Sequence, residues 1–288
     1  MSEFPRTVVG GVSVSRLVIG SNWFLGWSHT SLAWDKFIKE YQTRDRIADV
    51  LEVFLRAGVD TLMAPPHSLM VEAVREAEQR VGRKMILALT PRFCITDQGP
   101  TKEAGYGPQE YWPEEAFDIC KEMGATICMP HAAVTDSLLD KRDGVIRDLE
   151  RYTPMIRERG MIPGLSTHSP ETIIYCNRHG YDVEAYIQVF NAAGFLMHVE
   201  VDWAMRVIKN AQKPVMCIKP LAAGRLLPPV ALAFIWNAIR DQDMVVCGTA
   251  LPDEAKEVIE LSLAFLERRI PSNELQFTRS KLPLVEKK

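Results

Sequence analysis

Short apolar runs alternate with longer segments of helical periodicity along most of the chain. Apolar residues recur at helical spacing between residues 43 and 57, and Gly58 follows, a residue that ends helices with little strain. Ser68 and Ser169 are expected to cap the helices that follow them. The expected strands are 17–20, 58–63, 85–89, 126–129, 162–165, 185–190, 215–218 and 244–247. The expected helices are 43–57, 68–81, 114–123, one ending near 159, one from 169, 199–210, 229–240 and 253–268.

This order gives eight strand–helix units. Strict alternation of strands and helices requires a parallel sheet. Eight units within about 250 residues favour a closed (β/α)8 barrel over an open doubly wound sheet. No GxGxxG follows the first strand, so the dinucleotide-binding alternative lacks its fingerprint. We expect one domain over residues 1–288, with a polar C-terminal tail from about 270 to 288.

Composition excludes several classes of partner. The chain has 288 residues, of which 47% are hydrophobic and 25% charged, and its formal net charge is −3. Because no basic stripe is present, nucleic acid is not expected as a partner. No apolar run approaches the roughly 20 residues of a membrane span, and no signal peptide precedes the first strand. The six cysteines form no CxxC pair, which favours reduced thiols in a cytoplasmic protein. A small-molecule substrate is the expected partner, and the oligomeric state stays open.

Candidate chemistry lies at the ends of the expected strands, because barrels of this kind build their sites where strands run into the following loops. His67, His131 and His168 follow the second, fourth and fifth strands. Arg92 follows the third strand, and Lys219 ends the seventh. We therefore expect these five side chains at one end of the barrel.

An aromatic loop follows the first strand. Trp23 and Trp27 lie in the segment NWFLGW at 22–27. Aromatic rings near a barrel mouth can form a flat wall for a ligand. They can equally plug the top of the barrel, and the sequence does not separate these two roles.

Five segments in chain order resemble segments of the aldo-keto reductases. The segments are GVDTLMAPPH at 58–67, GLSTHSPETI at 164–173, YIQVFN at 186–191, PLAAGRL at 220–226, and ALAFIW at 231–236 followed by VVCGTALPDEAKEVIE at 245–260. The resemblance spans about residues 14–268. It implies the (β/α)8 fold and nicotinamide-linked carbonyl chemistry.

The resemblance implies an altered catalytic set. The family is expected to use a Tyr acid, a Lys, an Asp and a His around the substrate carbonyl. Asp60 matches the Asp and His131 the His, but Pro65 and Pro66 stand where the Tyr is expected and Thr90 where the Lys is. Reduction of a carbonyl needs a proton donor. Ordinary reduction of aldehydes is therefore expected to be weak or absent.

The resemblance also implies a cofactor side. Ser166 and Gln188 match positions that hold the nicotinamide carboxamide, and Thr167 replaces the usual Asn. The loop 221–226 and the turn 248–256 could receive a phosphate through backbone N–H groups and the start of a helix. The set implied to bind NADP or NAD is Ser166, Thr167, Gln188, Leu221, Arg225, Gly248, Thr249 and Lys256. These motifs could also persist as barrel scaffold without a cofactor.

Two functions of different class remain open. The first is a divergent NAD(P)-linked oxidoreductase on a small carbonyl, polyol or sugar-like substrate. Its proton donor would be His131, His67 or Lys219, and its substrate would lie near Trp23, Trp27, Arg92 and His168. The second is a cofactor-free, metal-dependent lyase, isomerase or hydrolase. In it, His67, His131 and His168 would bind a divalent ion such as zinc. We favour the first, because the cofactor-side motifs cover more residues.

A third option is a Schiff-base enzyme that uses Lys219. It would require a desolvated lysine with a lowered pKa. The sequence offers nothing further for it.

Overall fold

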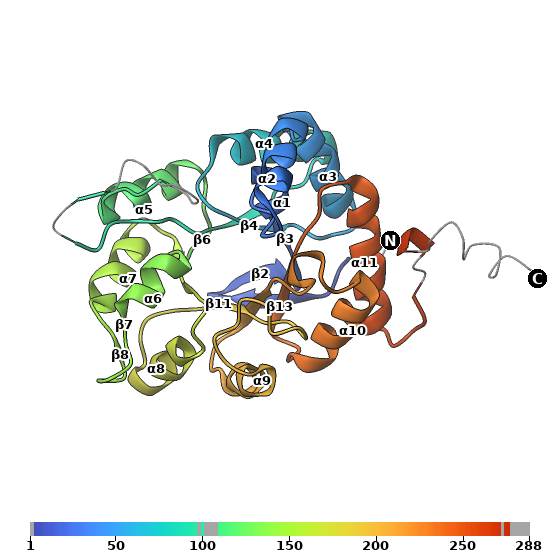
Figure 1. The fold of residues 1–288 in the computed structure, drawn as a ribbon. Coiled ribbons are helices and arrows are strands. Elements are labelled where there is room, and N and C mark those ends of the chain that lie inside the picture. Colours follow the sequence, from blue (N-terminus) through green and yellow to red (C-terminus); the bar gives the residue numbers. More distant parts are fainter. Residues whose placement is uncertain (1–2, 97–98, 101–108, 272–273, 277–288) are drawn as a thin grey trace, which may run out of the picture.

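The structure, a computed structural model, is a ring of parallel strands surrounded by helices (Figure 1). It describes residues 3–96, 99–100, 109–271 and 274–276. The strands of the ring are β3 (Leu17–Gly20), β4 (Thr61–Ala64), β5 (Ile86–Leu89), β6 (Ile127–Cys128), β9 (Ile162–Pro163), β10 (Leu165–Thr167), β11 (Tyr186–Val189), β12 (Val215–Ile218) and β13 (Met244–Gly248). The expected (β/α)8 barrel is confirmed.

Gly164 joins the two halves of the fifth barrel strand. β9 pairs with β6 on one side, and β10 pairs with β11 on the other, so together they close the ring on eight strands. A Cβ atom at Gly164 would lie 2.7 Å from the carbonyl oxygen of Ala185 and 2.7 Å from Cε of Met129. Only glycine therefore fits where the strand changes partners without moving the backbone beside it.

The helices lie outside the ring. They include α3 (Arg44–Arg56), α4 (Ser68–Val81), α5 (Pro113–Glu122), α6 (Ala132–Leu138), α7 (Leu149–Glu158), α8 (Glu171–His179), α9 (Val201–Asn210), α10 (Pro228–Ala238) and α11 (Pro252–Leu266). In α3 the buried Ile47, Leu51 and Phe54 share one face, and the Thr43 side chain caps its first turn. No described helix is long and apolar enough to cross a membrane.

Several elements were not expected from the sequence. A hairpin of β1 (Arg6–Val9) and β2 (Val12–Ser15) precedes the barrel, and two short helices, α1 (Asn22–Leu25) and α2 (Leu32–Tyr41), follow its first strand. The stretch expected as one helix ending near 159 is α6, a small hairpin of β7 (Leu139–Asp140) and β8 (Val145–Ile146), and α7. The expected tail forms the short helix η2 (Glu274–Gln276), and residues 277–288 lie outside the described residues.

The serine caps predicted from the sequence are wrong. The His67 side chain caps α4 in place of Ser68. Pro170 precedes α8, so Ser169 does not occupy the capping position.

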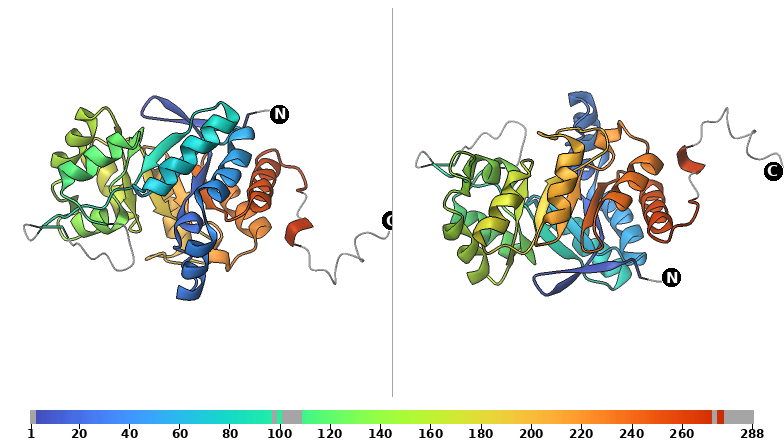
Figure 2. Two further views of the ribbon diagram at one scale, coloured as in Figure 1. Left: turned by 90° about the horizontal axis from the view of Figure 1, so that it is seen from above. Right: turned by 90° about the horizontal axis from the view of Figure 1, so that it is seen from below.

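The N-terminal hairpin covers one end of the barrel (Figure 2). Val9 and Val14 of the hairpin pack into the same buried cluster as the barrel-interior residues Val18, Met129 and Met216. The hairpin is also hydrogen-bonded to the segment just before β13, because the Thr7 hydroxyl donates to the Gln242 carbonyl at 3.0 Å. Since this covered end is where the strands begin, a substrate pocket can open only where they finish.

We expect Gly164→Ala to destabilise the fold. The new methyl group would overlap the Ala185 carbonyl oxygen, which belongs to the backbone and cannot rotate away. Overpacking of this kind typically costs about 1–3 kcal/mol. Urea unfolding followed by circular dichroism measures the change. An unchanged midpoint would mean that the fifth strand has room that the structure does not show.

Candidate active site

Positively charged and imidazole side chains gather where the barrel strands end. We call His29, Arg92, His131, His168 and Lys219 the mouth cluster. The charges of His168, Arg92 and Lys219 all act on His131, and the charge of Lys219 also acts on His168 and His29. Four of the five members were expected here from the sequence. His29, in the loop after α1, was not.

His131 is held as a neutral hydrogen-bond donor. It occupies the capping position of α6, where Nδ1 accepts a hydrogen bond from the Ala133 backbone N–H at 3.1 Å. In the neutral ring the proton must then sit on Nε2. Burial, followed by the charges of His168, Arg92 and Lys219, lowers the pKa of His131 to about 4. At neutral pH this residue therefore offers an Nε2–H group but no positive charge.

Asp136 fixes the segment that carries His168. One carboxylate oxygen accepts from the His168 backbone N–H at 3.1 Å and lies 3.8 Å from Nδ1 of its ring. The other accepts from the Thr167 hydroxyl. Burial and the Lys219 charge lower the pKa of His168, against the pull of Asp136. Because Thr167 is engaged by Asp136, its hydroxyl is not free to take over the amide role that the resemblance implied.

Lys219 carries a desolvated amine that has no carboxylate partner among the described residues. Its backbone has φ = 61°, a left-handed conformation that is uncommon outside glycine. Nζ lies 2.9 Å from Nε2 of His29, and no Asp or Glu of the described residues forms an ion pair with it. Burial lowers the pKa of Lys219 to about 8. The residue is therefore partly deprotonated just above neutral pH.

Gln188 presents an unsatisfied acceptor on the cofactor side. Its Nε2 donates to the carbonyls of His168 at 3.3 Å and Val189 at 3.2 Å. Its Oε1 is buried and has no partner among the described residues. Ser166 on β10 is also buried; it lies opposite Ile187, and Thr167 lies opposite Gln188. Leaving a buried acceptor unpaired costs about 1–3 kcal/mol.

Two further buried hydroxyls, those of Ser21 and Thr249, have no hydrogen-bond partner among the described residues. Each follows a glycine in the paired strands β3 and β13, where Gly20 lies opposite Gly248. Both residues therefore lie at the end of the ring where the strands finish.

The expected phosphate turn at 248–256 is already occupied by an acid. The backbone N–H groups of Ala250 and Leu251 donate to the Glu254 carboxylate, at 2.7 and 3.3 Å. Lys256 is paired with Asp253 at 2.9 Å on the surface. These groups do not fit a phosphate as the resemblance implied.

The loop after β12 is also satisfied internally. It forms the short helix η1 (Ala222–Gly224), in which the N–H groups of Gly224 and Leu226 both donate to the Leu221 carbonyl. Arg225 is exposed and stacks on the Phe195 ring at 4.0 Å. Of the cations expected for phosphate, Arg225 alone is without an ion pair in the described part of the chain.

The two tryptophans differ in placement. Trp23 lies against Gly248, since a Cβ atom there would come within 3.3 Å of its ring, and its ring meets Trp34 of α2 edge-on at 6.2 Å. Trp27 packs on the large hydrophobic cluster. Trp23 therefore adjoins the mouth, whereas Trp27 belongs to the packing beneath it.

Arg92 is paired with Glu110 at 2.8 Å.

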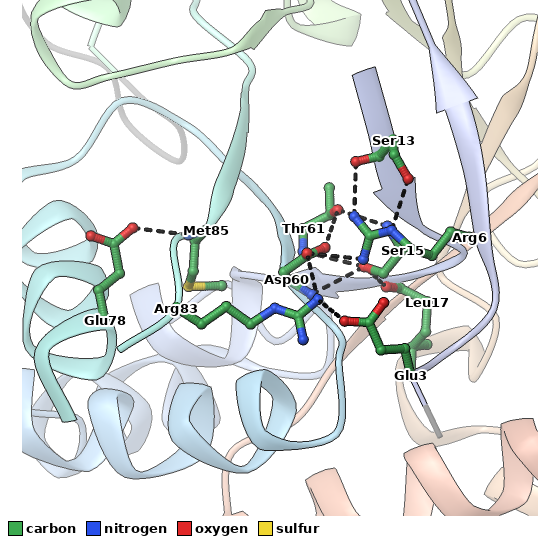
Figure 3. Close-up of polar contacts among 10 residues, drawn as sticks. All are labelled: Glu3, Arg6, Ser13, Ser15, Leu17, Asp60, Thr61, Glu78, Arg83 and Met85. Atoms are coloured by element: carbon green, nitrogen blue, oxygen red, sulfur yellow. Dashed lines mark hydrogen bonds and ion pairs between the residues drawn. The ribbon is translucent and has the colours of Figure 1, made fainter. Parts of the chain in front are cut away.

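Asp60 lies at the opposite end of the barrel, so the predicted catalytic role is wrong. It immediately precedes β4, and its carboxylate binds Arg6 at 2.9 Å and Arg83 at 3.2 Å (Figure 3). The Ser15 hydroxyl of the hairpin accepts a hydrogen bond from the Asp60 backbone N–H at 3.2 Å. The strand ends with Met63 and Ala64, so no acid stands at the mouth from this motif. Asp60 joins the hairpin to the barrel instead.

His67 does not join the mouth cluster. It is exposed, its Nδ1 accepts from the Leu69 backbone N–H at 3.2 Å, and it lines a narrow apolar gap with Met70 and Leu87. Within the described ranges, no group of three His, Cys, Asp or Glu side chains is arranged to hold a metal ion. The predicted triad of His67, His131 and His168 is therefore wrong.

The fold is that of the aldo-keto reductases. Solved structures that match it include a Pseudomonas aeruginosa protein assigned to the aldo-keto reductases (13% identity, TM-score 0.64, 91% of this chain and 95% of that one). An aldo-keto reductase from Bacillus halodurans (14%, 0.56, 95% and 94%) and a glycerol dehydrogenase from Gluconobacter oxydans (12%, 0.55, 93% and 97%) also match. The sequence matches no family model and no curated protein.

We expect Asp60→Ala to weaken the fold and leave ligand binding at the mouth unchanged. Removing the carboxylate leaves Arg6 and Arg83 without their shared partner, at a cost of about 1–3 kcal/mol. Asp241→Ala is the control, because Asp241 is fully exposed and its contact with Arg16 is long, at 3.8 Å. Chemical unfolding compares the two variants. Equal stability of both would contradict the bridging role of Asp60.

The ring of His131 should stay neutral from pH 8 down to about 5. Its lowered pKa, about 4, follows first from burial and then from the neighbouring charges, of which those of Arg92 and Lys219 persist at neutral pH. Nitrogen-15 NMR of the imidazoles should show protonated Nε2 and bare Nδ1 across that range, while an exposed histidine titrates near about 6.5. Titration of His131 near that ordinary value would show that the mouth is more hydrated than the structure indicates.

Proposed function

We propose that this protein is an NAD(P)-linked oxidoreductase that acts on a small carbonyl, polyol or sugar-like substrate. The observation that carries the proposal is the buried Oε1 of Gln188, near the end of β11, which has no partner among the described residues. An amide N–H₂ group is the donor that such an acceptor lacks. The carboxamide of a nicotinamide supplies that group, and the fold is one whose solved examples include a glycerol dehydrogenase, an enzyme of a polyol.

Gln188 and Ser166 would hold the nicotinamide, which supplies or accepts a hydride when bound. Both side chains are buried, so their hydrogen bonds would orient the ring away from bulk water. Arg225 is the cation proposed for the phosphates, because its guanidinium is exposed and free of an ion pair among the described residues. The Glu254 carboxylate on the neighbouring turn argues for a phosphate position nearer to Arg225 than to that turn.

His131 and Lys219 would replace the missing catalytic groups. The Nε2–H of His131 can donate to a carbonyl oxygen without giving up its proton, as a neutral electrophile. The Lys219 ammonium, with a pKa of about 8, is the group at the mouth suited to deliver a proton at neutral pH. Trp23 offers an aromatic face beside them. The metal-dependent alternative gains no support, because its three histidines do not converge.

We expect Gln188→Ala to weaken NADPH binding by about 5- to 150-fold, the equivalent of about 1–3 kcal/mol for one lost buried hydrogen bond. Gln212→Ala is the matched control, since Gln212 is exposed and bonds only to Asn177. Isothermal titration calorimetry with NADPH and NADH measures both variants. Absence of binding by the wild-type protein, or equal binding by both variants, would overturn the proposed function.

A further inference from the structure

Lys219 has two properties that let a lysine act as a nucleophile. Its amine is desolvated, with a pKa lowered to about 8 by burial. At pH 7 the neutral fraction of a lysine with the ordinary pKa, about 10.4, is about two hundredfold smaller. No carboxylate of the described residues pairs with it and holds it protonated, unlike Lys213 at the start of the same strand, which binds Glu184 at 2.9 Å.

The contact between Lys219 and His29 has a defined direction. Nε2 of His29 lies 2.9 Å from Nζ of Lys219 and 3.1 Å from Nδ2 of Asn22. The amide nitrogen of Asn22 can only donate, so Nε2 of His29 carries a lone pair and the ring proton sits on Nδ1. Loss of water around the ring and the Lys219 charge lower the pKa of His29 to about 4. A neutral base therefore faces the amine of Lys219.

The same cluster also contains a hydrogen-bond donor for the oxygen of a carbonyl substrate. His131 supplies an Nε2–H at the mouth, which would polarise a carbonyl oxygen. His168 also has a lowered pKa, from burial and the Lys219 charge, so it adds little positive charge to the cluster. The titratable and charged groups acting on these residues include Arg92, Arg225, Asp35, Asp136 and His198. None of the acids among them forms an ion pair with Lys219.

We propose that Lys219, with His29 as its base, forms a Schiff base with small aldehydes or ketones bound at the barrel mouth. Neutral Nζ adds to the carbonyl carbon, and one of its two protons passes through Nε2 of His29 to the carbonyl oxygen, which gives a neutral carbinolamine. The second Nζ proton then passes by the same route to the hydroxyl group, which leaves as water while the C=N bond forms. The net change is one amine and one carbonyl giving one imine and one water, and no oxidant or metal is needed.

This activity goes beyond hydride transfer and needs no nicotinamide. An imine draws electrons from the carbon next to the former carbonyl, so bonds at that carbon become easier to break. The substrate class is a carbonyl compound small enough to reach Nζ beside His29 and His131. The reactions opened by this step are those of lyases and isomerases.

Reductive trapping tests the proposal on the whole protein. The wild type is incubated with glyceraldehyde and sodium cyanoborohydride, without nicotinamide, and the labelled lysines are mapped by peptide mass spectrometry. We expect Lys219 to be labelled at least about tenfold faster than Lys213, with a rate that rises through pH of about 8. Labelling that follows surface exposure alone, or a Lys219 rate that rises only above pH of about 10, would overturn the proposal.

Two variants separate the amine from the fold. Lys219→Arg keeps the charge but has no amine, so label at this position should disappear while Lys213 reacts as before. His29→Ala keeps the amine but removes its base, so labelling of Lys219 should slow severalfold, and an unchanged rate would overturn the role of His29. Trapping without NADPH binding would refute only the proposed oxidoreductase function. NADPH binding without trapping would refute only the Schiff base.

Discussion

Ring closure of a parallel sheet is the constraint on which the rest of this molecule depends. Every strand of the ring runs in the same direction, so the C-terminal ends of these strands meet at one rim. The closure requires one strand to hydrogen-bond to both of its neighbours at different levels, and Gly164 allows this where the backbone of Ala185 passes close by. Residues separated by long stretches of sequence thereby reach one mouth, while the hairpin covers the other end.

Basic side chains gather at the barrel mouth, and their surroundings lower the pKa of most of them. Burial and neighbouring positive charge lower the pKa of His29 and of His131 to about 4, whereas burial lowers the pKa of Lys219 only to about 8. Desolvation disfavours the charged form of an amine, and no nearby carboxylate compensates within the described part of the chain. Perturbed groups of this kind cluster at functional sites more often than elsewhere. Both proposed activities draw on the same amine, one on its protonated form and the other on its neutral form.

Sequence patterns predicted the regular elements well, because buried strands and amphipathic helices leave apolar periodicity. The expected bounds 17–20 and 215–218 coincide with β3 and β12, and the expected end of α4 at Val81 is also correct. The missed hairpin did have a signal, since Gly10 and Gly11 stand between two β-branched runs. Asp60 was misplaced because the motif alone does not say whether it begins or ends its strand, and a few residues carry a side chain from one end of a short strand to the other.

The site was predictable only in part. Lys219, His131 and His168 follow expected strands, so topology alone brings them to one end. Nothing in the sequence connects His29 with Lys219, which lies 190 positions further along. The pKa of a lysine depends on burial and on the absence of an acid around it, and neither is a property of sequence pattern. The sequence likewise did not show that Glu254 accepts hydrogen bonds from the backbone N–H groups of Ala250 and Leu251, because Glu254 is one of several charged residues at the start of its helix.

The hairpin also bears on the order in which the protein can be assembled. Thr7 bonds to Gln242, 235 positions away, and Arg16 bonds to the Asp243 carbonyl. Contacts of such separation form late, because the intervening chain must be arranged before its ends can meet. During synthesis residues 6–15 emerge first, and their two strands can pair with each other at once. Their bonds to Gln242 and Asp243 must wait until the last strand has been made, so the covered end of the barrel is sealed only when the chain is nearly complete.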